Sequence, residues 1–268
     1  MLIVTLGDVL LDVIVRLEEP LTTGADATVS TSVGAGGQAA NVAAWAVALG
    51  EEGRCVSRRG DDPAGALVGA ELQARGVAFA GVIGGRTGVV VSLVARDGER
   101  TMASDRADAP ALTPADLEAG WFACDCLHIS GYALLASPSD SAAARAAKLA
   151  RSAGARLSLD LSAWTRIKAH GPDRFRAQVH ALAPDVIFGD EGEWNVIGDV
   201  PGARIVKRGR DGFDVVEDGR TRRCQAADAA VVDTTGAGDA LAAGFLVGGP
   251  ELAAEAAARC VQKLGAMP

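Results

Sequence analysis

The most informative stretch of this sequence is Val231-Val232-Asp233-Thr234-Thr235-Gly236-Ala237-Gly238-Asp239-Ala240. It joins the end of an apolar segment to a small-residue helix, expected over about residues 239–247. Gly236 and Gly238 allow the backbone to pass close to a ligand, and the first turn of the helix offers unpaired N–H groups with a partial positive charge. A plain turn before a helix would also use threonine and glycine. The ordered run of small residues, followed by the Asp239 carboxylate, favours a phosphoryl-binding site beside a general base.

Apolar runs of strand length alternate with alanine-rich helical segments along the rest of the chain. The expected strands are 2–6, 54–57, 126–130, 156–161, 185–188 and 204–206. Helices are expected over 41–49 and 63–75, and a further helix start is expected at Thr113-Pro114. Because the strands are almost entirely apolar, they predict a mainly parallel sheet covered by helices on both faces. The expected fold is therefore a three-layer α/β/α domain over residues 1–268.

Two other segments alternate polar and apolar residues, as half-exposed strands do. Residues 11–17 are one of them, and the other surrounds Asp97-Gly98, a dipeptide typical of a hairpin turn. Together they predict a small β-sheet that stands off the main body as a lid, formed by about 11–33 and 88–104. A second hairpin is expected at Asp218-Gly219, in the C-terminal half of the chain.

Charge and composition exclude several classes of protein. The chain has 26 basic and 34 acidic residues and a net charge of -8, with no basic run to follow a phosphate backbone, so nucleic acid is not an expected partner. No apolar stretch reaches the roughly 20 residues of a membrane span. No signal segment is recognised at the start, and a cytoplasmic location is expected. The five cysteines are scattered and lack a metal-binding spacing, so they are interpreted as free buried thiols.

In the 231–240 stretch, and in the Gly244-Phe245 pair behind it, the sequence resembles the ribokinase-like carbohydrate kinase family. The resemblance extends over essentially the whole chain. It implies an ATP-dependent kinase that phosphorylates a hydroxyl, expected to be a primary one, of a small sugar or sugar-like molecule. Asp239 would take the proton from that hydroxyl, and the amides of Gly236, Ala237 and Gly238 would hold the charge of the moving phosphoryl group. No G-x-x-x-x-G-K-[ST] motif occurs, which excludes a P-loop kinase.

Residues 34–41, Gly-Ala-Gly-Gly-Gln-Ala-Ala-Asn, precede an expected helix. A dinucleotide-binding turn is the alternative interpretation, but the strand that enters the segment alternates, whereas such a turn follows a buried and continuously apolar strand. The segment resembles the sugar-binding loop of the family. By this resemblance the sugar ligands would be Gly36, Gly37, Gln38 and Asn41, with Asp12 from the first lid strand. Asp160, at the end of an expected strand, lies where the family has a D-x-N element and is also expected on the substrate side.

Two further segments resemble the nucleotide side of the family's site. Residues 188–193 are similar to an N-x-x-E element, with Asp190 in place of Asn and with Glu193 matching. An acidic helix N-terminus would explain both residues equally well. Residues 206–212 are similar to the segment that lines the nucleotide phosphates, although a turn into the second hairpin is an equal interpretation. The implied nucleotide ligands are Asp190, Lys207, Gly209, Gly212 and Thr235, and Glu193 would bind magnesium through water.

The implied cofactors are ATP and Mg²⁺, with K⁺ possible near Asp233, and a homodimer formed through the lid is a further expectation from the family. Two alternatives stay open. A nucleoside kinase of the same fold is disfavoured because aromatic residues are scarce near the lid. A non-catalytic sugar sensor is disfavoured by the intact 236–239 element but supported by the altered Asp190. His128 and Arg106 are interpreted as a core histidine and a solvated arginine.

Overall fold

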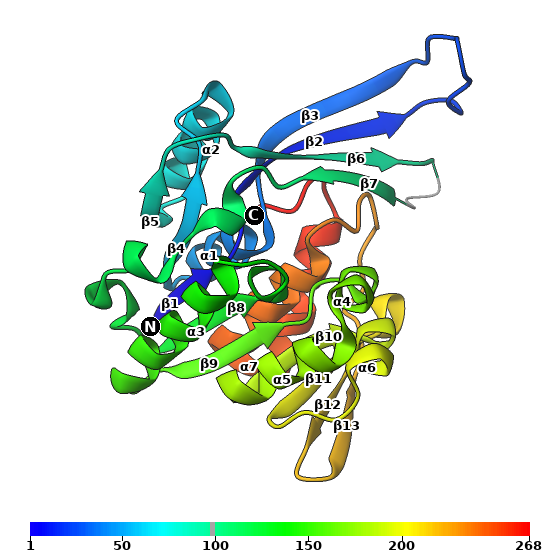
Figure 1. Ribbon diagram of the computed structural model, residues 1–268. Helices are drawn as coiled ribbons and strands as arrows, with labels where there is room; N and C mark the ends of the chain where they lie inside the picture. The colour runs from blue at the N-terminus through cyan, green and yellow to red at the C-terminus, as the bar shows by residue number, and fades with distance from the viewer. Residues whose placement is uncertain (97–99) are drawn as a thin grey trace.

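The protein is built on two β-sheets, which the computed structural model describes over residues 1–96 and 100–268 (Figure 1). The larger sheet has nine strands in the order β13-β12-β11-β10-β9-β8-β1-β4-β5. These strands are β1 (Leu2–Leu6), β4 (Glu52–Arg59), β5 (Ala78–Ile83), β8 (Cys126–Ser130), β9 (Arg156–Asp160), β10 (Val186–Asp190), β11 (Ala203–Lys207), β12 (Phe213–Glu217) and β13 (Arg220–Cys224). All neighbours from β5 to β11 pair in parallel, and the hairpin β12–β13 is antiparallel.

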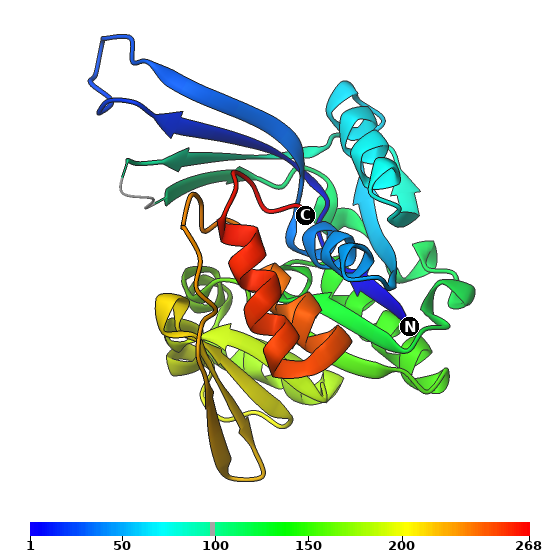
Figure 2. The same cartoon turned by 180° about the vertical axis from the view of Figure 1, so that it is seen from behind.

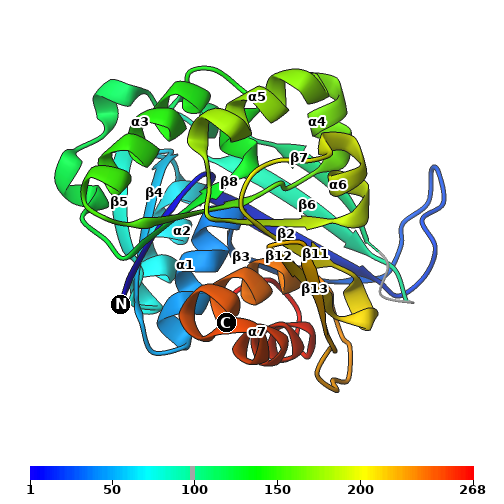
Figure 3. The same ribbon diagram turned by 90° about the horizontal axis from the view of Figure 1, so that it is seen from below.

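Helices cover both faces of this sheet, as Figure 3 shows. One face carries α1 (Gln38–Ala48), α2 (Pro63–Ala74) and α7 (Ala237–Val261). The other carries α3 (Ser139–Ser152), α4 (Trp164–His170), α5 (Pro172–Leu182) and α6 (Glu191–Ile197). Short 3-10 helices span Ala109–Ala111, Pro114–Asp116, Ala119–Phe122, Gly131–Leu134 and Gly209–Asp211. Strand β8, in the interior of the sheet, is buried at every position because it is covered from both sides. The expected three-layer α/β/α fold is confirmed.

The smaller sheet has four strands in the order β3-β2-β6-β7 and projects from the main body (Figures 1 and 2). Its strands are β2 (Leu10–Leu17), β3 (Val29–Gly36), β6 (Gly88–Val94) and β7 (Arg100–Asp105). They come from the two segments for which alternation predicts a separate sheet. The turn predicted at Asp97-Gly98 lies outside the described residues. Strand β2 follows β1 after three residues, and β3 leads directly into α1, so the small sheet is joined to the main body beside the ends of the parallel strands.

Other expectations differ in detail from the structure. The helix expected over about 239–247 is the first piece of α7: Gly248 and Gly249 leave helical geometry, and Pro250 starts a second piece that runs to Val261. At Thr113 a helix was expected, but the structure has a capping box on a single 3-10 turn. The second hairpin is confirmed, with Asp218 and Gly219 at φ of 50° and 72°. Among the described residues, no helix has the length and apolar character needed to cross a membrane.

Candidate active site

A cleft of about 190 Å³ lies where the small sheet meets the carboxyl ends of the parallel strands and the start of α7. Ligands bind at this end of open α/β sheets because the loops there diverge from the strands. Most of the residues that the sequence assigns to a site line this cleft. They are Asp12, Gly37, Gln38, Asn41, Asp160, Lys207, Thr235, Gly236, Gly238 and Asp239.

The loop before α7 is held by Asp233, which is fully buried. Its Oδ1 atom accepts hydrogen bonds from the N–H and the hydroxyl of Thr235 at 2.9 and 2.7 Å, and its Oδ2 atom accepts from Gly265 N at 2.9 Å. The Thr235 hydroxyl, expected to contact the nucleotide, is thus turned toward Asp233. The carboxylate of Asp233 therefore sets the shape of the loop that precedes the helix.

Gly236 has φ of 78° and caps the N-terminus of α7. A Cβ atom there would lie 2.4 Å from Cβ of Ala266, so this position requires glycine for both conformation and space. The N–H of Ala237 already donates to Thr234 O at 3.3 Å. Of the three amides expected to hold a phosphoryl group, those of Gly236 and Gly238 belong to residues that line the cleft, whereas Ala237 does not line it.

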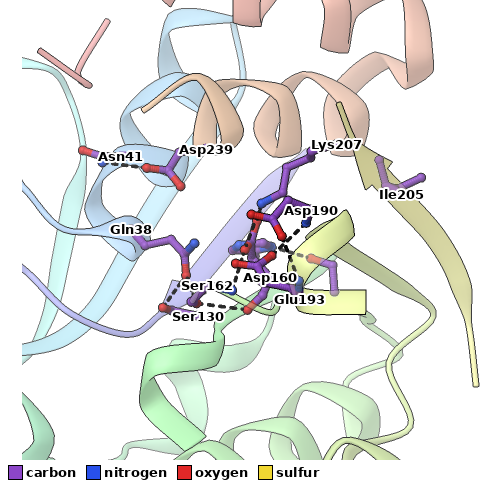
Figure 4. A network of polar contacts seen from close by, with 12 residues as sticks. Gln38, Asn41, Ser130, Asp160, Ser162, Asp190, Glu193, Ile205, Lys207 and Asp239 are labelled. Carbon is purple, nitrogen blue, oxygen red and sulfur yellow. Dashed lines mark hydrogen bonds and ion pairs between the residues drawn. The ribbon is translucent and has the colours of Figure 1, made fainter. Parts of the chain in front are cut away.

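Asp239 lies in the first turn of α7, and one oxygen of its carboxylate accepts a hydrogen bond from Asn41 Nδ2 at 2.7 Å (Figure 4). Burial raises the pKa of Asp239 to about 6, against the lowering effect of this hydrogen bond, and the charge of Asp160 raises it further. Asn41 is itself buried in α1. The amide expected to bind sugar thus orients Asp239, and the second carboxylate oxygen is the one left for a ligand in the cleft.

Asp12 enters the cleft from β2, as expected for a residue on the first strand of the small sheet. Burial raises the pKa of Asp12 to about 7, and the negative charges of Asp239 and Asp233 contribute in the same direction. Gly36, expected to bind sugar, lies beneath this carboxylate: a Cβ atom on Gly36 would lie 2.0 Å from Asp12 Oδ2. Gly36 therefore makes room for Asp12 and does not line the cleft itself.

Asp160, at the end of β9, forms an ion pair with Lys207 at the end of β11. The Lys207 ammonium lies 2.9 Å from Asp160 Oδ2 and 3.2 Å from Oδ1. Burial acts to lower the pKa of Lys207, but the charges of Asp160 and Glu193 outweigh it and raise that pKa above its usual range. Ser162 N donates to Asp160 Oδ1 at 2.9 Å, and the Ser162 hydroxyl donates to Gln38 Oε1 at 2.7 Å.

A second, more open cavity of about 470 Å³ adjoins the carboxyl ends of β10 and β11. Among the predicted nucleotide ligands, Asp190, Lys207 and Gly209 line it. Gly212 does not, because it packs on the hairpin: a Cβ atom there would lie 2.1 Å from Cys224 O. Sequence reasoning missed Arg208 and Arg223, two cations that also line this cavity and that bond to Asp214.

Asp190 and Glu193 form a reciprocal capping box at the start of α6. Glu193 N donates to Asp190 Oδ1, and Asp190 N donates to Glu193 Oε2, both at 2.8 Å. Burial raises the pKa of Glu193 to about 7. No cluster of three or more acidic, histidine or cysteine side chains with metal-binding geometry occurs in the described ranges 1–96 and 100–268. Magnesium commonly keeps several waters and binds through one or two carboxylates plus phosphates, a mode that this pair of carboxylates fits.

A third group of residues on the cleft was not predicted as a site. Arg106 is not the solvated arginine that the sequence suggested: its side chain is 18% exposed, forms an ion pair with Asp8, and lies over the Tyr132 ring at 3.4 Å from the centroid. Asp8 lies two residues after the end of β1, and this position at the carboxyl end of a parallel strand could have indicated a site residue. His128 is a core histidine, as predicted, fully buried with Nδ1 at 2.8 Å from Ser158 Oγ.

Comparisons with known proteins agree with this geometry. The family model described as pfkB family carbohydrate kinase matches residues 1–267. An ATP-dependent ribose-1-phosphate kinase of Halopiger xanaduensis is 31% identical over 260 residues, which cover 91% of this chain and 83% of the relative.

Two solved structures share the fold. A probable sugar kinase of Rhizobium etli superposes with a TM-score of 0.89 at 22% identity, covering 99% of this chain and 94% of the other. An uncharacterised sugar kinase of Pyrococcus horikoshii in complex with ATP superposes with a TM-score of 0.85 at 21% identity, covering 99% and 95%. From the family match over nearly its whole length, this chain belongs to the pfkB family of carbohydrate kinases.

Proposed function

We propose that this kinase transfers the γ-phosphoryl group of ATP to a hydroxyl of a small sugar, with Asp239 as the general base. The observation that carries the proposal is the Asp239 carboxylate, which lines the cleft at the first turn of α7 with one oxygen fixed by Asn41. The free oxygen can accept the hydroxyl proton, and the positive end of the helix favours the charge that develops on the phosphoryl group. The name of the Halopiger relative, an ATP-dependent kinase, supports ATP as the donor.

The second cavity is the proposed place of the nucleotide. Its lysine and arginine side chains, Lys207, Arg208 and Arg223, can bind the negative charge of phosphates. Mg²⁺, held through water by Glu193 and Asp190, would neutralise part of that charge when it is bound. K⁺ is proposed beside Asp233, since within the described residues this buried carboxylate has no cationic side chain in contact.

An uncharged sugar is the substrate class that the cleft favours. Two arginines line it beside Lys207: Arg106 is paired with Asp8, and the charge of Arg100 acts on the carboxylates of Asp12 and Asp239. Asp12 also lines the cleft and would repel an anionic sugar when ionised. One face of the Tyr132 ring is covered by the Arg106 guanidinium, so that face is not available for stacking on a nucleobase. Both observations favour a neutral sugar over a sugar phosphate or a nucleoside.

Turnover of magnesium-ATP against a panel of acceptors tests the proposal. The panel contains neutral ketoses, aldoses and inositols, with sugar acids, ribose 1-phosphate and nucleosides as comparison groups. We expect a neutral sugar to have the highest kcat/KM, by about tenfold or more, because an unpaired charge or an uncompensated polar group in the cleft is costly. Preference for ribose 1-phosphate or a nucleoside would contradict the substrate class. Sugar binding without any turnover would support the non-catalytic sensor instead.

The pH dependence of the reaction follows from the raised pKa of Asp239. A general base acts when it is deprotonated, so kcat/KM should rise with pH through about 6 and level off above about 7.5. The rise should be broad because the nearby Asp12 has a pKa of about 7. Initial rates between pH 5 and 8.5 at constant ionic strength, with a pH-insensitive coupling assay, measure this profile. A rate that stays constant down to about pH 5 would show that the base has an ordinary carboxyl pKa.

A further inference from the structure

Lys207 is a lining residue of both cavities described above, the cleft under the small sheet and the open cavity on the nucleotide side. No other residue of the two linings is shared among the described residues. The Lys207 ammonium also lies beside the start of α7, because a Cβ atom on Gly238 would be 3.4 Å from Lys207 Nζ. Lys207 thus stands at the boundary that a phosphoryl group would cross between nucleotide and sugar.

The position of this ammonium is fixed from below by Asp160, which is 1% exposed and contacts it through both carboxylate oxygens. Figure 4 shows the two side chains meeting in the space between Glu193 and Asp239. A buried ion pair is weak evidence for stability, because desolvation of two charges offsets much of their attraction. The position of this pair at the junction of two cavities is suited to a role in the site.

We propose that Lys207 is a catalytic residue of phosphoryl transfer and that Asp160, expected from the sequence to bind the sugar, is its positioning residue. The inference rests on the proposed function. In the reaction, the bond between the γ-phosphorus and the bridging oxygen of ADP breaks while the sugar oxygen bonds to phosphorus. The hydroxyl proton goes to Asp239. Lys207 keeps its proton throughout, and its positive charge stabilises the oxygens of the phosphoryl group as it moves across the boundary.

A purely structural role for Lys207 is the competing explanation, since it could serve only to neutralise the buried Asp160. The two roles differ in what happens when both charges are removed together. If Lys207 only neutralises Asp160, the double variant Lys207→Gln/Asp160→Asn restores both folding and turnover. If Lys207 acts on the phosphoryl group, the double variant restores folding alone.

The experiment compares Lys207→Gln, Asp160→Asn and the double variant with the wild type, by steady-state kinetics and thermal melting. We expect Lys207→Gln to lower kcat by about 10²–10³-fold with the sugar KM changed by less than about threefold. Asp160→Asn should lower kcat by about tenfold, also without raising the sugar KM. The double variant should melt near the wild-type temperature and retain the low kcat of Lys207→Gln. Lys148→Gln, on the exposed face of α3, is the matched control and should leave kcat unchanged.

A double variant with kcat within about threefold of wild type would overturn the proposal. So would a Lys207→Gln enzyme that loses only affinity, with kcat unchanged. A raised sugar KM in Asp160→Asn, with kcat preserved, would return Asp160 to the substrate side and remove its positioning role. Wild-type protein that phosphorylates no acceptor would instead contradict the proposed function, so the two failures are distinguishable.

Discussion

Replacement of Asp239 by asparagine is expected to remove most turnover while making the folded protein more stable. The amide keeps the shape of the side chain and can still accept a hydrogen bond from Asn41 Nδ2, but it cannot take a proton. Loss of a positioned base lowers kcat by about 10²–10⁴-fold. Measurement of kcat at saturating ATP and sugar, near pH 8, gives the effect directly.

The stability gain follows from the sign of the pKa shift. The pKa of Asp239 rises from 3.8 to about 6 on folding, so the folded state binds the proton more tightly than the unfolded state. The contribution of Asp239 to stability is highest below about pH 3.8 and is lost as the pH rises through about 6, because an ionised carboxylate is then held in the cleft. Neutral asparagine avoids this loss at pH 8. Allowing for partial exposure, the gain is about 1 kcal/mol, or a rise in Tm of about 2–4 °C.

Asp228→Asn provides the control for the loss of one negative charge, since Asp228 is exposed in the loop after β13. It should change neither kcat nor Tm by a measurable amount. Wild-type turnover in Asp239→Asn would remove Asp239 as the base. An unchanged kcat in both variants would point to another proton acceptor in the cleft.

Replacement of Gly236 by alanine is expected to lower both kcat and Tm. The new Cβ atom would lie 2.4 Å from Cβ and 2.5 Å from Cα of Ala266, and the residue would also have to keep φ of 78°. Relief of this contact displaces the loop that brings Gly236 and Gly238 to the cleft. We expect kcat to fall by about 10²-fold or more. The strain and the overpacking together should lower stability by about 3 kcal/mol, which corresponds to a Tm decrease of about 6–12 °C.

Gly219→Ala separates the effect of backbone conformation from that of the contact. Gly219 has nearly the same φ, 72°, but lies at the tip of the β12–β13 hairpin with no atom within 4 Å of its Cβ position. Only the conformational strain applies there, about 1 kcal/mol, and kcat should not change. If Gly236→Ala retains normal kcat while its Tm falls, the loop tolerates displacement and its amides do not assist the reaction.

The parts of the fold and site that could be predicted are those that depend on residues close in sequence. The loop before α7 has its glycines, its buried Asp233 and its Asp239 within a few positions, so composition and spacing indicate its shape. The small sheet could be predicted because alternation of polar and apolar residues is typical of a strand with one buried face and one exposed face. The family resemblance then supplied the chemistry that local patterns do not specify.

Contacts between distant segments could not be predicted. Arginine is a residue type that usually lies on the surface, and only the fold brings Arg106 to Asp8 and to the Tyr132 ring. Lys207 and Asp160 form an ion pair because the carboxyl ends of β9 and β11 lie close together, on either side of β10. Such pairs depend on the order of the strands in the sheet, and the local pattern of polar and apolar residues does not specify that order.

Strand β13 closes one end of the nine-stranded sheet, and its outer edge has no neighbouring strand among the described residues. Its sequence, Arg220-Thr221-Arg222-Arg223-Cys224, carries three arginines along that edge. An uncovered edge is a template for strand addition from another molecule, and charged side chains along the edge strand oppose that addition. Arg222 pairs with Glu251 and Arg223 with Asp214, so charged side chains of both signs border this edge. The kinase should therefore resist ribbon-like aggregation at this end of the sheet, even in concentrated solution.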